Sequence, residues 1–115
     1  MTEFKANLKR VNISPTKYLN VINDRAKLLK YNKVQFANDG IHKLMIQDET
    51  GKYIYFGNCN YGDFIIYLFL EMLNTVPEGT ADKKRNAYLA RANNIKGNWK
   101  LNKYSKNNLA INLLW

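Results

Sequence analysis

The longest apolar run in the chain, FIIYLFLEML at residues 64–73, is the feature that most limits how the protein can fold. It is about half as long as a membrane span and contains Glu71, so we expect it to be buried within the protein and to span no membrane. Both a strand and a helix fit the run. Its length and the preceding Asp63, which suits a helix N-cap, favour a helix over residues 63–73.

Three further helices are predicted. Each follows a Ser or Thr, whose side-chain oxygen can accept a hydrogen bond from the first helical turn. The last of them carries leucines that must reach a core, and Trp115 after it is expected to dock because undocked chain ends fray. The predicted helices and their caps are 15–30 after Ser14, 81–95 after Thr80 and 106–114 after Ser105.

Residues 42–48 and 52–58 predict two antiparallel strands around a glycine-containing turn. Their apolar residues alternate, so that Leu44 and Ile46 share one face of the first strand and Phe56 lies on one face of the second. We therefore predict an α+β fold, in which a small antiparallel β-hairpin packs with about four short helices. A chain of 115 residues is expected to form a single domain.

The net charge of +9 is distributed unevenly along the chain. Residues 1–38 carry a net charge of +6 and residues 80–115 one of +7, whereas residues 39–79 between them carry −4. This pattern fits an anionic partner such as nucleic acid, and it also fits packing between the basic ends and acidic middles of neighbouring copies. Lysine outnumbers arginine by 14 to 4, which argues against base-specific readout, where the arginine fork is preferred.

Residues suited to catalysis or metal binding are scarce. The single histidine, His42, and the single cysteine, Cys59, are too few soft ligands for a zinc site. No nucleophile motif adjoins His42, no basic residue adjoins Cys59, and the sequence contains no phosphate-binding glycine loop. We therefore predict a non-catalytic protein with no metal and no cofactor.

The predicted helix at 81–95 mixes basic residues with apolar ones on the same faces. Such mixing is expected where an arginine pairs internally with a carboxylate, for instance Asp63, and also where a helix binds an anion. The sequence leaves both interpretations open. The helix has two adjacent stripes at steps of three and four: Lys84, Tyr88, Arg91 and Ile95, then Ala81, Arg85, Leu89 and Ala92.

The cations of the two basic ends are the candidates for binding an anion or a partner protein. The aromatic residues around them are suited to base stacking and equally to packing at a protein interface. The candidate cations are Lys9, Arg10, Lys83, Lys84, Arg85 and Arg91.

The motifs FG, GDF, KR..YLAR, NW and LLW follow one another between residues 56 and 115. In this order they resemble a family of small uncharacterised proteins of large nucleocytoplasmic DNA viruses, the giant viruses. The resemblance covers residues 42–115 and leaves out residues 1–41, a basic segment with a predicted helix. Many members carry a histidine after the second arginine, where this chain has Ala92. The motif residues include Phe56, Gly57, Asp63, Lys84, Arg85, Tyr88, Arg91, Trp99 and Trp115.

The resemblance implies a viral setting and no established activity. It implies a location in the virion or in the cytoplasm or viral factory of an infected host cell, and residues 1–14 contain no apolar signal core. We expect a minor capsid or capsid-associated virion protein that packs between viral capsid or core proteins, or against copies of itself. The alternative is a basic nucleic-acid-binding protein that acts in genome packaging or in handling viral DNA or RNA.

Overall fold

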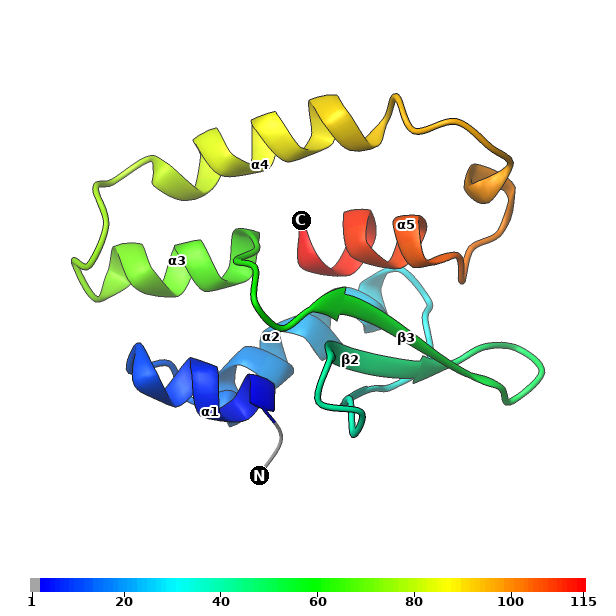
Figure 1. Cartoon of the computed structure of the whole chain (residues 1–115), viewed down its shortest axis with the longest axis horizontal. Coiled ribbons are helices and arrows are strands. Elements are labelled where there is room, and N and C mark those ends of the chain that lie inside the picture. The colour runs from blue at the N-terminus through cyan, green and yellow to red at the C-terminus, as the bar shows by residue number, and fades with distance from the viewer. Residues whose placement is uncertain (1–2) are drawn as a thin grey trace.

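The computed structural model describes residues 3–115 and has the predicted α+β fold (Figure 1). Its sheet has three antiparallel strands in the order β1-β2-β3. The predicted hairpin is confirmed as β2 and β3, in which Leu44 lies opposite Phe56 and Ile46 opposite Ile54. The third strand, β1, pairs with the other edge of β2 and was not predicted, because three residues are too few to show an alternating pattern. The strands are Val34–Phe36 (β1), His42–Gln47 (β2) and Tyr53–Asn58 (β3).

Five helices and two short helical turns complete the fold. The apolar run is a helix, as its length favoured, and the Asp63 side chain caps it by accepting a hydrogen bond from the Ile66 backbone at 2.8 Å. None of the described helices is long and apolar enough to cross a membrane. The elements are α1 (Glu3–Arg10), α2 (Pro15–Leu28), α3 (Phe64–Met72), α4 (Thr80–Ala92), the 3₁₀ turn η1 (Trp99–Leu101), α5 (Lys106–Leu109) and the π turn η2 (Ala110–Leu114).

The predicted helix caps are confirmed at two places and wrong at one. Ser14 and Ser105 each accept a backbone hydrogen bond from the first turn of the helix that follows. Thr80 is instead the first residue of α4, and its hydroxyl donates to the Pro77 carbonyl oxygen at 2.6 Å. Gly79 holds the N-cap position with a φ of +91°, which a glycine adopts without the strain of a Cβ.

Helix α1 is an element that the sequence analysis missed. Its length of eight residues gives a weak periodic signal, and only Phe4 and Leu8 on its inner side are buried. Both join a single core with residues of α2, the sheet and the C-terminal helix. The C-terminal leucines do reach this core, since Leu109 and Leu113 are fully buried.

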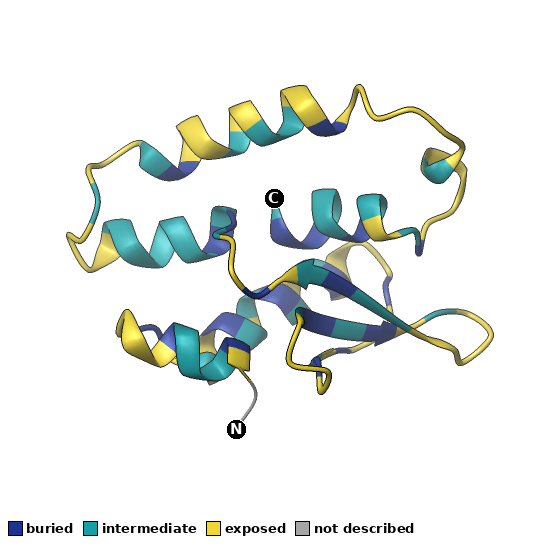
Figure 2. Cartoon of the chain, in the orientation of Figure 1, coloured by how far each residue is buried: buried dark blue, intermediate teal, exposed yellow. Residues whose placement is uncertain are grey.

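Helix α4 is an outer element of the molecule. It runs antiparallel to α3 and extends past it above the C-terminal end of the chain (Figure 1). Its side toward the body is buried or half-buried, whereas the opposite side is exposed (Figure 2). α4 ends at Ala92, three residues earlier than predicted, and an exposed loop follows it. This placement leaves a cleft between α4 and the body.

Candidate functional site

A buried ion pair fixes the loop that enters α3. Lys43 Nζ lies 2.7 Å from Asp63 Oδ2, and the Tyr18 hydroxyl donates to the same oxygen at 2.7 Å. Both charged side chains are buried, Lys43 to 2% exposure and Asp63 to 0%. Burial, and then the negative charge of Asp63, raise the pKa of Tyr18 well above its usual value. Of the two interpretations that the sequence left open for the helix at 81–95, an internal pair of an arginine with Asp63 does not form, because Lys43 and Tyr18 occupy this carboxylate.

Sequence reasoning missed Lys43 because strand alternation places it on the face opposite Leu44, which would face water in a two-stranded hairpin. In the structure this face is covered, and Lys43 Nζ lies 5.4 Å from the centre of the Phe4 ring on α1. Gly57 allows the close packing: a Cβ there would lie 3.0 Å from Leu114 Cδ1 and 3.2 Å from Lys43 Cδ. The FG motif therefore has a packing role at this position.

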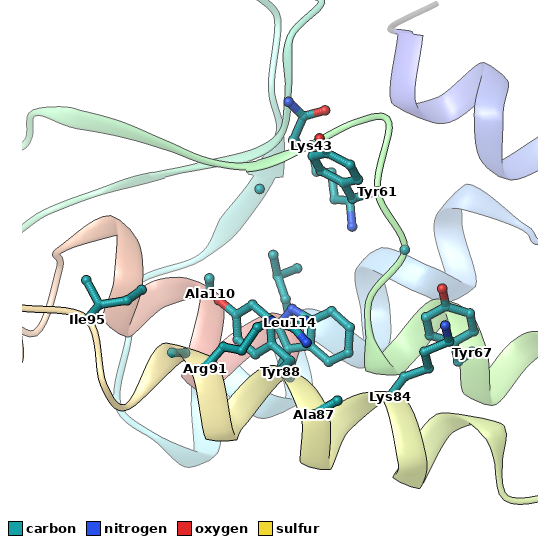
Figure 3. Close-up of a pocket in the computed structure, with 15 residues that line it drawn as sticks. Lys43, Tyr61, Tyr67, Lys84, Ala87, Tyr88, Arg91, Ile95, Ala110 and Leu114 are labelled. Carbon is teal, nitrogen blue, oxygen red and sulfur yellow. The ribbon is translucent and has the colours of Figure 1, made fainter.

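The α4 cleft, as we name it, has a volume of about 570 Å³ and lies between α4 and the loop that joins β3 to α3. Tyr61 and Lys43 are on the sheet side, and Lys84, Tyr88 and Arg91 project from α4 on the other side (Figure 3). The first predicted stripe of α4 is thus the one that faces the cleft. Its lining also includes Gly57, Gly62, Tyr67, Ile95, Leu114 and Trp115.

Two cations of the cleft are free to meet an anion. Lys84 and Arg91 are exposed and form no ion pair with any residue of 3–115. Lys84 Nζ lies 5.7 Å from the centre of the Tyr67 ring, a cation–π contact that leaves the charge accessible. No Asp or Glu among residues 3–115 lines the cleft. The side chains that line the cleft therefore carry positive charge and no negative charge.

Aromatic rings form the walls between these cations. Tyr88 and Trp115 stack with their ring centres 4.4 Å apart and their planes at 9°. Burial raises the pKa of Tyr88, while the nearby Arg91 acts to lower it. Tyr61 is 71% exposed, so most of its ring remains open to a ligand. Gly62 packs closely beside it, because a Cβ there would lie 2.9 Å from the Tyr67 ring, which would have to move.

The second stripe of α4 faces the body, and Arg85 lies on it. Arg85 Nε donates to the Trp115 carbonyl oxygen at 2.7 Å, and its guanidinium lies 5.6 Å from the Phe64 ring centre. Arg25 on α2 is close to it: burial, and then the charge of Arg85, lower the pKa of Arg25. The Nη1 atom of Arg25 is buried without a hydrogen-bond partner in the described part of the chain. Arg85 thus has a structural contact, although not the predicted one.

The other predicted residues lie apart from the α4 cleft. Lys83 is exposed and does not line it, and Lys9 and Arg10 lie on α1. Phe56 belongs to the core, and the Trp99 indole donates to the Ile95 carbonyl oxygen at 2.9 Å in the loop after α4. Of the candidate cations, the structure brings together Lys84 and Arg91.

His42 and Cys59 do not face each other. His42 lies opposite Asn58 at the end of the β2–β3 ladder, whereas Cys59 lies in the turn after β3, where its Sγ is 3.7 Å from the Gly40 carbonyl oxygen. His42 Nδ1 lies 2.5 Å from Asp39 Oδ2. Slight burial acts to raise the pKa of Asp39, but hydrogen bonds from His42 and Ile41 lower it to about 2. Across residues 3–115, no group of three or more His, Cys, Asp or Glu side chains could hold a metal ion.

Comparisons of the chain with protein-family models, with curated proteins and with solved structures find no match. Function is therefore inferred from the α4 cleft itself.

Proposed function

We propose that the protein is a non-catalytic nucleic-acid-binding protein that holds a single-stranded segment in the α4 cleft. The observation that carries this proposal is the combination of two unpaired cations with aromatic rings, one of them the exposed Tyr61, in one cleft that no Asp or Glu side chain of residues 3–115 lines. Proteins that bind single strands combine these same two elements, since cations attract the phosphates and aromatic side chains stack on the bases.

A single strand fits this cleft better than a duplex because stacking requires unpaired bases. The open ring of Tyr61 lies across the cleft from Lys84 and Arg91, so a base on the ring would bring its phosphate toward α4 (Figure 3). The cations contact phosphates, which position a strand but carry no sequence information. We therefore expect binding with little sequence preference.

Fluorescence anisotropy with labelled oligothymidylate, across a salt series, tests the proposal. Wild-type protein should bind with micromolar affinity at about 50 mM salt and lose affinity steeply as salt rises. Lys84→Gln and Arg91→Gln should each reduce the slope of log K against log salt by about 0.7, the value for one phosphate contact on a single strand.

Lys17→Gln is the matched control, because Lys17 is exposed and lines no described cleft. This variant should bind as the wild type does. Absence of binding at about 50 mM salt, or equal losses in the control and the cleft variants, would contradict the proposed site. Tighter binding of a duplex than of a single strand would contradict the role of the rings.

A second proposal, a minor capsid or capsid-associated role, is supported by an apolar surface at the end of α3. Met72, the last residue of α3, is 77% exposed, and Leu73 at the C-cap is 45% exposed. An exposed apolar pair of this kind is suited to packing against capsid or core proteins, or against another copy. Mass spectrometry of purified virions from an infected host cell tests it, and absence from the particles would exclude this role.

A further inference from the structure

A second cleft adjoins the first. It has a volume of about 340 Å³ and lies between α1 and the loop at residues 59–62. Tyr61 and Gly62 line both clefts. The exposed Tyr61 ring therefore stands at the boundary, where a ligand leaving one cleft would enter the other.

The second cleft has its own cation, Arg10, at the end of α1. Its side chain is 68% exposed, and its contacts are short-range ones on its own helix: Nη1 lies 2.5 Å from Asn7 Oδ1 and 3.9 Å from a carboxylate oxygen of Glu3. An exposed ion pair of this length contributes little, so the guanidinium is available to a phosphate. Glu3 does not line the cleft.

The position of Arg10 relative to the α4 cleft is fixed by direct contacts. Asn7 Nδ2 donates to the Cys59 carbonyl oxygen at 3.0 Å, which joins α1 to the loop. The other end of the same loop is held by the buried Asp63 with Lys43. The two clefts therefore adjoin through one loop, with cations at both ends and Tyr61 between them.

We propose that the two clefts form one track, along which a single nucleic-acid strand runs from Lys84 and Arg91, across Tyr61, to Arg10. This inference rests on the proposed function and extends it, because it assigns a second binding segment on α1 and a path for the strand between the two clefts. A short oligonucleotide fills the α4 cleft alone, and a longer one also reaches Arg10.

The test compares two oligothymidylates. One has about 3 nucleotides, which is shorter than the usual site of a single-strand binder, and the other has about 12, which lies within the usual range of site sizes. Anisotropy across a salt series is measured for wild type, Arg10→Gln and Lys9→Gln. Lys9 is the matched control, since it is the preceding residue of α1, has the same charge, is exposed and lines neither cleft.

Arg10→Gln should leave the short oligonucleotide unaffected, weaken the long one about threefold and reduce its salt slope by about 0.7. Lys9→Gln should change neither. Tyr61→Leu should weaken the long oligonucleotide by about tenfold, because it removes the stacking surface between the clefts. Thermal unfolding of each variant confirms that the fold is retained.

The outcomes separate the two proposals. If Arg91→Gln weakens binding but Arg10→Gln does not at any length, the track is wrong and the α4 cleft stands. Equal effects of Lys9→Gln and Arg10→Gln would show a general charge effect and overturn the track. If the wild-type protein binds neither oligonucleotide, both proposals fail.

Discussion

The Lys43–Asp63 pair and the α4 cleft both contain positive charge, but they differ in what surrounds it. Lys43 is buried, with a carboxylate at 2.7 Å that also receives the Tyr18 hydroxyl. Lys84 and Arg91 are exposed and form no ion pair within residues 3–115, and they lie beside the aromatic rings of the same cleft. Removing one partner of a buried pair leaves an uncompensated charge in the interior and destabilises the fold, whereas an unpaired charge at a cleft remains available for a ligand.

The largest effect is expected from breaking the buried pair. Lys43→Met leaves Asp63 buried and without its counter-ion, which should lower the free energy of unfolding by about 3–5 kcal/mol. Urea denaturation measures this change. The double variant Lys43→Met with Asp63→Asn removes both charges and should recover much of the loss, because a neutral amide can still meet Tyr18. A loss below about 1 kcal/mol in the single variant would contradict a structural role for the pair.

The sequence predicted the elements that have a strong local signal. The periodicity of α2, the alternation of β2 and β3, and the Ser14 and Ser105 caps are properties of neighbouring residues, and the structure has them. The spacing of residues in α4 also places Lys84 and Arg91 on one stripe, and both line one cleft, but the sequence did not indicate which stripe would face a cleft.

What the sequence did not predict depends on contacts between distant segments. Lys43 and Asp63 are 20 residues apart, and Tyr18 is 45 residues from Asp63. No local pattern indicates that Tyr18, Asp63 and the Phe4 ring come together around Lys43. The sequence therefore left the partner of Asp63 open, since charge alone does not show which cation is brought within reach.

Tyr88 lines the α4 cleft and also stacks on Trp115. Loss of this stacking is expected to have the next largest effect on the stability of the fold. Tyr88→Leu keeps an apolar side chain but removes the stacked ring pair, so unfolding should become easier by about 1 kcal/mol. Thermal unfolding measures this, and Trp115 fluorescence should change because its ring loses a neighbour. Tyr53→Leu, on a 42% exposed residue without a described ring partner, is the control. Equal losses in the two variants would show that stacking contributes nothing.

Arg25 is less buried than Lys43 and less exposed than Lys84 and Arg91, and its guanidinium does not have all of its hydrogen bonds within the described part of the chain. Its buried Nη1 atom has no hydrogen-bond partner among residues 3–115, and Arg85 repels it. Arg25→Met keeps the aliphatic volume and removes the unsatisfied donor, so it should stabilise the protein by up to about 1 kcal/mol. Arg25→Lys retains a charge and should show no gain. Destabilisation by Arg25→Met in urea denaturation would show that the guanidinium has a compensating contact.

Substitutions of the exposed cations in the α4 cleft are expected to have the smallest effect on stability. Lys84→Gln and Arg91→Gln remove exposed charges without an ion-pair partner in the described chain, so the free energy of unfolding should change by less than about 0.5 kcal/mol. Oligothymidylate affinity should nevertheless fall in both variants. A stability loss as large as that of Lys43→Met would mean that Lys84 and Arg91 stabilise the fold. The contrast between the buried, paired Lys43 and the exposed, unpaired cations of the cleft would then be wrong.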